Sequence, residues 1–335
     1  MHKFGYICCL GIWLLTLAGC HQQKSKVPVI GFVEAFEDAT IADARKGFVK
    51  ALADSGFSED AKSVKIDYRN AQGDAGTLNQ IISYFINEPV ALIGTSTTLA
   101  TMAAVQRNKK IPVFMTVTAM PHILGLLDKN GNPPSNLFGT GEELNYIDTS
   151  FTLIPKTLKP VDGSKLRIGM IYNQSEPQSV DAYKRIDSLA EVAGVSLIAM
   201  PLNNSAEAQL VTKALLAKKI DAFFANPDNT VFAAFEVILK NCDEQHVPVF
   251  TSEAGLVKRG AVAAFGADIY QWGYQSGAQA AAYLKGRNRT GTAGSHPLKV
   301  TLLTLRKSVY NPQAAAKYGL HFPDSFKSVN ETAVK

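Results

Sequence analysis

Hydroxyl side chains stand directly after two short apolar segments of this 335-residue chain. They are Thr95, Ser96, Thr97 and Thr98 after one segment, and Thr116 and Thr118 after the next. Hydroxyls and free backbone N–H groups at the start of a helix can bind an anion such as a carboxylate. Ordinary helix capping explains one or two of these residues equally well, but hydroxyls at two strand ends favour a small-ligand site.

Amide and carboxyl side chains form a second set in the later half of the chain. Its members are Asn173, Glu176, Ser179, Asp228, Asn229 and Glu253. Carboxylates in such positions accept charge-assisted hydrogen bonds from an ammonium group, which offset the cost of burying it. The alternative roles are structural: a first-turn acid for Glu176, a local hydrogen bond for Ser179 and helix caps for Asp228 and Asn229. Together the two sets match the two ends of a zwitterionic amino acid.

Acids and an aromatic ring follow the first apolar segment. Glu34 and Phe36 lie nearest the predicted strand end and are expected to face a ligand. Asp38 and Asp43 are better explained as favourable charge at a helix N-terminus. Phe36, together with Tyr172 or Tyr270, offers a ring that stacks on an aromatic or apolar ligand side chain.

Catalytic patterns are missing around these acids. Glu176, Asp228 and Glu253 have no histidine partner, no metal-ligand spacing and no nucleophile elbow, and the sequence holds no HExxH or CxxC motif. We therefore predict a binding protein without catalytic residues, metal or cofactor. An acid/base enzyme is the more distant alternative.

Short apolar runs alternate with amphipathic segments along most of the chain, which indicates βαβ units and parallel sheets. Strands are predicted over 29–32, 64–68, 90–94, 112–116, 137–139, 166–172, 195–200, 222–225 and 247–250. Helices are predicted over 41–55, 76–87, 99–107, 179–193, 206–217 and 231–241. The pattern restarts after a linker at 155–164, so the fold class is α/β with two doubly wound parallel-sheet lobes. Ligands of such sheets bind beyond the carboxyl ends of the strands.

Three further pieces follow the second sheet. They are a strand over 262–265, a helix over 271–285 and a strand over 300–303. We expect them to return to the two sheets, with a surface loop over 286–297.

The N-terminal segment indicates export and lipidation. Residues 1–3 are cationic, 4–17 are apolar, and Ala18 and Gly19 precede Cys20. The apolar run is shorter than the ~20 residues of a spanning helix. It resembles a bacterial lipobox, which predicts a signal peptide over 1–19, lipidation at Cys20 and a tether over 20–27. A plain membrane anchor or an ordinary cleaved signal is the alternative.

The charge and the cysteine content narrow the possible classes of function further. The formal net charge of +5 is spread without blocks of Lys or Arg, which favours solubility over nucleic-acid recognition. Cys242 is the only thiol after Cys20, so no disulfide framework is expected and Cys242 is predicted to be a half-buried helix residue.

Several stretches match a known family in order along nearly the whole predicted mature chain. They are 43–48, 68–74, Tyr172 and Asn173 with Glu176 and Ser179, 227–231, Gly260 and Ala261 with Gly266, and Tyr310 and Asn311 with Ala314 and Ala315. On these residues the chain resembles the bacterial ABC-transporter substrate-binding lipoproteins of the tryptophan/tyrosine-binding type, which are similar in fold to type I periplasmic binding proteins. It departs from the family pattern at 34–38, at 118–121 and at Gln178, where asparagine is usual.

The resemblance implies three crossovers between the lobes, near 139–143, 253–260 and 296–299. Lobe 1 is then expected over 28–140 and 258–297, and lobe 2 over 141–257 and 298–330. It also implies hinge closure on a small ligand, with an aromatic amino acid as the leading hypothesis and a purine or sugar as the alternative.

The expected partners are an ABC permease and its ATPase. The protein is expected to be a monomer in the cell envelope, held by a lipid anchor on the periplasmic face of a membrane or on the outer cell surface. The alternative is a receptor lipoprotein that signals to a membrane sensor instead of delivering its ligand to a permease. It would use the same residues, so this alternative stays open. A repressor-type regulator is excluded, because no basic helix-turn-helix precedes residue 29.

Overall fold

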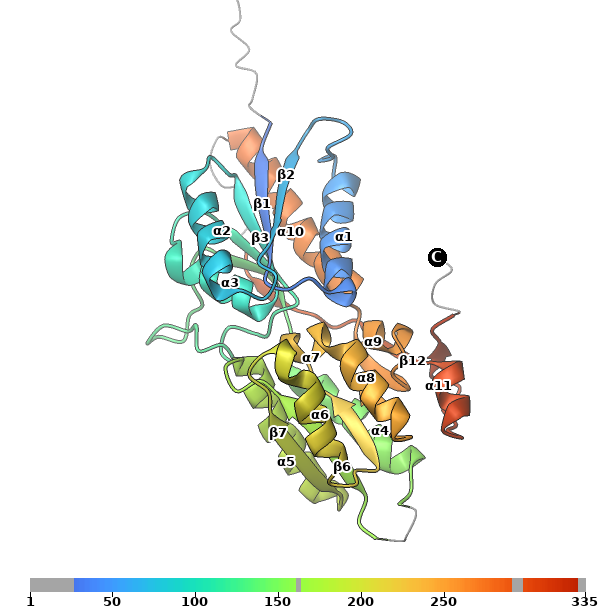
Figure 1. Ribbon diagram of the computed structural model, residues 1–335. Helices are drawn as coiled ribbons and strands as arrows, with labels where there is room; N and C mark the ends of the chain where they lie inside the picture. Colours follow the sequence, from blue (N-terminus) through green and yellow to red (C-terminus); the bar gives the residue numbers. More distant parts are fainter. Residues whose placement is uncertain (1–26, 161–163, 291–297, 331–335) are drawn as a thin grey trace, which may run out of the picture.

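The first lobe, the upper one in Figure 1, is built on a six-stranded parallel sheet. Its strand order is β11-β5-β4-β3-β1-β2. The computed structural model describes residues 27–160, 164–290 and 298–330. The strands are β1 (Val29–Glu34), β2 (Lys65–Asn70), β3 (Leu92–Ser96), β4 (Val113–Thr116), β5 (Leu137–Gly141) and β11 (Val300–Leu302). The central strands are buried on both faces, as expected for parallel strands covered by helices.

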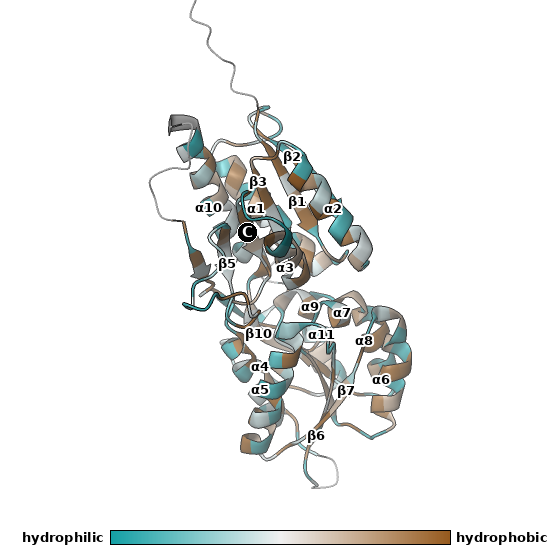
Figure 2. Cartoon of the chain, turned by 90° about the vertical axis from the view of Figure 1, so that its left-hand side faces the viewer, coloured by the Kyte–Doolittle hydropathy of each residue, from teal (hydrophilic) through white to brown (hydrophobic). Residues whose placement is uncertain are grey.

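Two helices cover each face of this sheet. Phe48 and Leu52 of α1 (Ala39–Asp54) and Leu284 of α10 (Ile269–Thr290) share one apolar cluster with strand residues. α2 (Ala75–Asn87) and α3 (Thr98–Arg107) share the other cluster with β1, β3 and β4. In Figure 2 brown segments, which mark apolar residues, alternate with teal segments, which mark polar residues, along these helices.

Close packing of α1 on α10 depends on glycines. A Cβ at Gly273 would lie 1.7 Å from the Ala44 carbonyl oxygen, and one at Gly47 would lie 2.0 Å from the Tyr270 carbonyl oxygen. Both atoms belong to the backbone, which cannot move aside cheaply. Glycine is therefore required where these two helices cross.

The second lobe contains a four-stranded parallel sheet with the order β7-β6-β8-β9 and a three-stranded sheet with the order β10-β12-β13. Its strands are β6 (Arg167–Tyr172), β7 (Ser196–Pro201), β8 (Ala222–Ala225), β9 (Val249–Thr251), β10 (Ala263–Ala267), β12 (Arg306–Tyr310) and β13 (Lys327–Ser328). β10 and β12 are antiparallel, while β12 and β13 are parallel. The α/β fold class is therefore as predicted, with a small mixed sheet added in lobe 2.

The helices of this lobe again lie on both sides of the sheet. They are α4 (Ile147–Thr157), α5 (Pro177–Ala193), α6 (Ala208–Leu216), α7 (Asn229–Ala233), α8 (Phe235–Glu244), α9 (Ala254–Lys258) and α11 (Pro312–Lys317), with 3-10 turns η1 (Leu144–Tyr146) and η2 (Ser205–Glu207). α4 and α5 pack in one apolar cluster, and α6 and α8 in the other.

Cys242 of α8 is fully buried, not half-buried as the sequence had predicted. Burial raises the pKa of its thiol, so the thiol is structural.

The chain crosses between the lobes three times: after β5, between β10 and α10, and between β11 and β12. The first crossover lies where it was predicted. The other two differ, because β10 pairs with β12 in lobe 2 and β11 pairs with β5 in lobe 1. The predicted assignments of 258–267 to lobe 1 and of 300–302 to lobe 2 are therefore wrong.

The N-terminal predictions fall on residues 1–26, so Cys20 and all but the last residue of the tether lie outside the described residues. Within the part of the chain that the structure describes, no helix is both long and apolar enough to cross a bilayer.

Candidate functional site

A pocket lies between the two lobes and is lined by residues from both. Lobe 1 and its crossovers contribute Thr98, Val117, Ala119, Glu142 and Trp272. η1 contributes Leu144 and Tyr146, and the rest of lobe 2 contributes Gln178, Pro227, Asp228, Asn229, Phe232 and Glu253. The carboxyl ends of the parallel strands carry most of these residues, as the doubly wound topology requires. This set is called the interlobe pocket below.

Glu176 lies behind the lobe 2 wall of the interlobe pocket and is saturated with hydrogen bonds. Its Oε2 accepts from the Asn229 backbone N–H at 3.1 Å, from Asn229 Nδ2 at 2.8 Å and from Gln178 Nε2, while its Oε1 accepts from Thr230 Oγ1 at 2.9 Å. Asn173 Nδ2 adds a longer contact to Oε1 at 3.4 Å. Burial and the charge of Asp228 raise the pKa of Glu176 to about 8, while these donors oppose the shift. Glu176 thus fixes the loop that leads into α7.

Asp228 has two roles in the structure. It caps α7 through a hydrogen bond from the Val231 N–H at 2.9 Å, and it also lines the interlobe pocket. Its other oxygen accepts from the Asn173 N–H at 2.6 Å and from Ser179 Oγ. Burial raises the pKa of this carboxyl. Glu176 and Ser179 therefore have the structural roles given as the alternative, and Asp228 has the expected capping role as well as a place in the pocket. Asn173 does not line the pocket, whereas Asn229 does.

Two further carboxylates lie where the crossovers meet lobe 2. Glu253 Oε1 accepts a hydrogen bond from Tyr146 Oη at 2.7 Å, and Glu142 Oε1 pairs with Arg306 Nη2 at 2.7 Å. The Arg306 guanidinium also lies over the Tyr146 ring, 5.1 Å from its centroid. Glu142 and Glu253 are 1% and 2% exposed, and burial raises the pKa of each to about 8.

The predicted hydroxyls of lobe 1 divide into an internal group and a pocket residue. Thr95 and Thr118 each bond Thr101 Oγ1, at 2.8 and 3.0 Å, and Thr116 Oγ1 donates to the Thr95 carbonyl at 3.2 Å. These three side chains tie β3, α3 and β4 together and do not line the pocket. Thr98, the first residue of α3, lines it.

Strained backbone flanks Thr98. Thr97 caps α3 with a φ of +89°, and Val117, a pocket residue, has a φ of +48°. Positive φ is costly for β-branched residues and concentrates at functional sites. The buried Ser96 Oγ beside Thr97 has no hydrogen-bond partner among the described residues.

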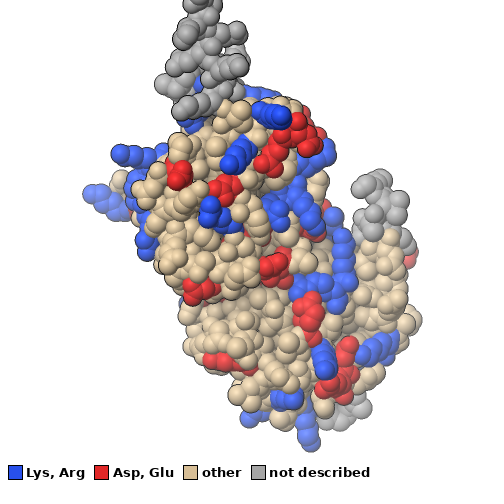
Figure 3. Space-filling model, turned by 45° about the horizontal axis from the view of Figure 1, so that its top comes forward, with Lys and Arg blue, Asp and Glu red and all other residues tan. Residues whose placement is uncertain are grey.

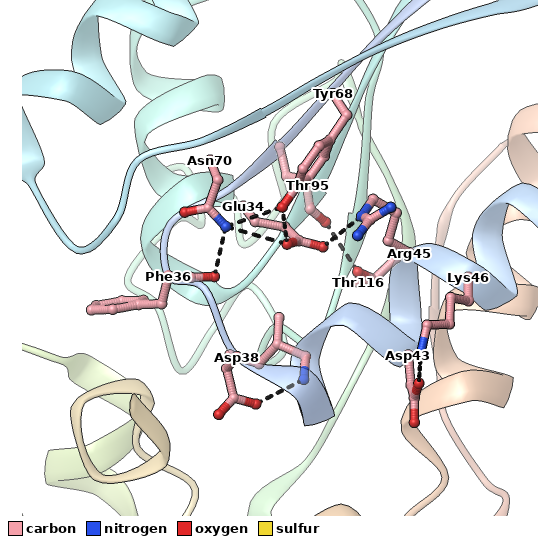
Figure 4. A network of polar contacts seen from close by, with 11 residues as sticks. Glu34, Phe36, Asp38, Asp43, Arg45, Lys46, Tyr68, Asn70, Thr95 and Thr116 are labelled. Atoms are coloured by element: carbon pink, nitrogen blue, oxygen red, sulfur yellow. Dashed lines mark hydrogen bonds and ion pairs between the residues drawn. The ribbon is translucent and has the colours of Figure 1, made fainter. Parts of the chain in front are cut away.

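Glu34 points into lobe 1 rather than toward the pocket (Figure 4). Its carboxylate accepts from Tyr68 Oη at 2.7 Å and from Arg45 Nε at 3.2 Å, so it ties β1, β2 and α1 together. Phe36 extends away from this network and packs partly against the α2 and α3 side of the sheet. Tyr270 lines a separate hollow with Thr40, Asp43 and Lys258. The expectation that Glu34, Phe36 and Tyr270 line one pocket with the later carboxylates is therefore not met.

The pocket residues that sequence reasoning missed include Glu142, Tyr146, Phe232 and Trp272. Trp272 Nε1 donates to the Thr140 carbonyl at 2.6 Å, which fixes the indole against the first crossover. Glu142 lies three residues after the predicted strand 137–139 and within the predicted first crossover, a signal that was available and not used. Tyr146 and Trp272 belong to segments whose position becomes defined only when the lobes are assembled.

The lobes also contact each other beside the pocket. Arg259, directly after α9 in lobe 2, pairs with Asp38 of lobe 1 at 2.6 Å and with Glu236 of lobe 2 at 2.7 Å. Asp38 caps α1 with its other oxygen, at the helix N-terminus where its charge was predicted to lie. A Cβ at Gly255 would lie 2.2 Å from Thr40, so the start of α1 is pressed onto α9.

Comparisons with known proteins place this architecture in a family. The sequence model of the family described as ABC transporter substrate binding protein matches residues 26–334. A curated relative, the tyrosine-binding protein of Clostridioides difficile strain R20291, is 32% identical over 295 residues, which cover 83% of this chain and 82% of that protein.

Solved structures with the same fold include an ABC domain from Streptococcus pneumonia in complex with L-Trp. It has a TM-score of 0.78 and 22% identity, with 90% of this chain and 99% of that chain covered. A ligand-free, open substrate-binding protein with adhesive properties from Clostridium difficile has a TM-score of 0.63 and 27% identity, with 90% and 99% covered. The lower TM-score against the open structure, despite its higher identity, accords with the interlobe contacts of Arg259.

Proposed function

Because the chain belongs to the ABC transporter substrate-binding family, whose members bind small molecules outside the cytoplasm and work with permease components, we propose that it binds an aromatic amino acid between its lobes. One observation carries the choice of ligand. The interlobe pocket combines rings, Tyr146, Phe232 and Trp272, with the buried carboxylates Glu142, Asp228 and Glu253. Rings favour a flat apolar side chain, and buried acids favour an ammonium group.

The opposite end of the ligand has a matching environment. Thr98 places the first turn of α3 at the pocket, where backbone N–H groups and the helix dipole favour a carboxylate. The relative named as tyrosine-binding and the neighbour solved with L-Trp support the same ligand class.

Isothermal titration calorimetry of the purified protein tests this function. We expect saturable heat with at least one of L-tyrosine, L-tryptophan and L-phenylalanine, and none with ribose, glucose or adenine. Heat from a sugar or purine alone contradicts the proposal. Mass spectrometry after prolonged incubation should recover the bound amino acid unchanged, because the protein is proposed to bind without catalysis.

We further propose that Cys20 is lipidated and that the tethered protein delivers its ligand to a permease. Tethering raises the effective concentration of the binding protein at its membrane partner. Membrane fractionation of Cys20→Ala against the parent chain tests the anchor: the variant should leave the membrane fraction, and retention there equal to the parent contradicts lipidation.

A further inference from the structure

Two carboxylate oxygens in the interlobe pocket have no hydrogen-bond partner. Glu142 and Glu253 each use Oε1, in contacts of 2.7 Å with Arg306 Nη2 and Tyr146 Oη respectively. The Oε2 atom of each is buried and without a hydrogen-bond partner among the described residues. Both residues line the interlobe pocket. Leaving a buried acceptor unsatisfied costs free energy, so such an atom in a pocket indicates a ligand donor.

We propose that Glu142 Oε2 and Glu253 Oε2 together form the subsite for a primary ammonium group of the ligand. This inference rests on the proposed function and assigns the ammonium end of the amino acid. In the complex with a cationic ligand both carboxyls are taken to release their protons, and Arg306, paired to Glu142, then leaves one negative charge to be balanced. A monovalent ammonium supplies that charge and donates hydrogen bonds to both oxygens.

The other acids of the second lobe are already satisfied. Glu176 accepts from Gln178, Asn229 and Thr230, and Asp228 accepts from backbone and hydroxyl donors on both of its oxygens. Neither carboxylate has an oxygen among the buried unpartnered atoms. They support the wall of the interlobe pocket, whereas Glu142 and Glu253 each have one oxygen, Oε2, that can still accept a hydrogen bond.

The position of the subsite couples binding to the hinge. Glu142 follows β5 on the first crossover, Arg306 begins β12 after the third crossover, and Glu253 lies in lobe 2 immediately before α9. An ammonium shared by Glu142 and Glu253 therefore joins a crossover to lobe 2. Arg306 and Tyr146 act as positioning residues, because each holds the oxygen that faces away from the ligand.

An analogue pair tests the subsite on the unmodified full chain. Calorimetry compares L-tyrosine with 3-(4-hydroxyphenyl)propionate, which keeps the ring and the carboxylate but lacks the ammonium. We expect the analogue to bind at least about 100-fold more weakly, as loss of charge-assisted hydrogen bonds to two buried carboxylates requires. Equal affinities for the two compounds overturn the ammonium subsite while leaving the aromatic ligand in place.

Isosteric variants locate the subsite. Glu142→Gln and Glu253→Gln should each weaken L-tyrosine binding by roughly 10- to 100-fold. The matched control is Glu143→Gln, whose side chain is partly exposed and contacts His122 outside the pocket. Unfolding curves of each variant identify any loss of folding, and the analogue pair needs no variant at all.

The outcomes separate the two proposals. Wild-type affinity for L-tyrosine in both folded glutamine variants overturns the subsite alone. Absence of heat from all three aromatic amino acids with the unmodified chain overturns the proposed function and the subsite together.

Discussion

At the residue scale, Glu142 and Glu253 affect the stability of the unliganded protein. Burial raises the pKa of each from 4.5 to about 8, and the groups that face them are Arg306, Tyr146 and each other. The folded protein therefore holds protons that the unfolded chain has released. The resulting stabilisation is fully present below pH 4.5 and is lost as the pH rises through about 8.

We predict that the unliganded protein melts at progressively lower temperature between about pH 5 and pH 8.5. Glu142→Gln removes one titrating group, so its melting temperature should fall less steeply over this window. Differential scanning calorimetry at constant ionic strength measures both slopes. A steeper fall in the variant than in the parent, or a parent whose melting temperature rises with pH, contradicts the prediction.

A second prediction concerns Trp272, the one tryptophan among the described residues. Its ring lines the pocket and its Nε1 is held by the Thr140 carbonyl. Binding of L-phenylalanine or L-tyrosine should therefore change tryptophan fluorescence. Trp272→Phe should abolish the change and weaken binding by roughly 3- to 10-fold, because the ring contact shrinks and the hydrogen bond is lost.

The control is made in the full-length chain, before any cleavage ahead of Cys20, and is Trp13→Phe, since Trp13 and Trp272 are the two tryptophans of the chain. This variant should keep the full fluorescence response. A response that disappears with Trp13 instead would show that the pocket ring does not sense the ligand.

Residue type alone predicted where polar groups gather but not which of them face the cleft. Thr95, Thr116 and Thr118 were expected beside Thr98, yet their hydroxyls bond the Thr101 hydroxyl or a backbone carbonyl inside lobe 1. Side chains alternate between the two sides of a strand, and a short strand with apolar residues on both faces gives no clue to the side. For the same reason, the sequence did not indicate that Glu34 bonds Tyr68 and Arg45 inside lobe 1.

At the element scale, the alternation of apolar runs and amphipathic segments predicted the parallel strands well, because both features are local. Several elements were not predicted, among them α4 and β12. Ile147, Phe151 and Ile154 recur at helical spacing in α4, but Pro155 in its last turn resembled the start of a linker. β12 is only partly buried and carries Arg306 and Lys307, so no apolar run marks it.

The crossing of α1 and α10 yields a prediction at this scale. Gly273→Ala puts a methyl group where 1.7 Å separates it from the Ala44 carbonyl oxygen, so the helices must move apart. We expect a loss of about 1–3 kcal/mol in the free energy of unfolding, measured by urea denaturation. Gly76→Ala is the matched control, because Gly76 is exposed in α2 and its added methyl meets only a side-chain atom at 3.2 Å. Similar losses in both variants contradict the packing argument.

At the scale of the whole molecule, the assignment of segments to lobes could not be read from the sequence. β10 and β11 are short strands on either side of α10, and each has a composition that suits either sheet. Only long-range pairing, of β10 with β12 and of β11 with β5, decides to which lobe each strand belongs.

Positive and negative charges are mixed on the surface of the molecule. On the face in Figure 3, basic and acidic side chains lie near one another on both lobes.

The contact between Arg259 and Asp38 holds the two lobes in the arrangement that this structure shows. The Arg259 side chain is 16% exposed and the Asp38 side chain 1% exposed, so the pair is largely shielded from solvent. Arg259 Nη2 also donates to the Phe232 carbonyl at 3.0 Å and to Glu236, which anchors the guanidinium to lobe 2. Among the described residues, its hydrogen bonds to lobe 1 are the one to Asp38 and a longer one to Thr40.

We predict that Asp38→Asn opens the unliganded protein and weakens L-tyrosine binding by roughly 3- to 10-fold. Asparagine still caps α1, so the change removes the charge pair and keeps the helix end. Glu236→Gln is the control, because Glu236 pairs with the same guanidinium within lobe 2 and is 65% exposed. Small-angle X-ray scattering measures the opening, and calorimetry measures the affinity.

The two measurements are linked by the population of the closed state. If the ligand binds only the closed lobes, the apparent dissociation constant is the intrinsic constant divided by the closed fraction. A variant that lowers the closed fraction must then lose affinity in the same proportion, and saturating ligand must return its radius of gyration to that of the parent. Loss of affinity without opening would place Asp38 in local packing of the pocket, and opening without loss of affinity would show that ligand binding does not require closure.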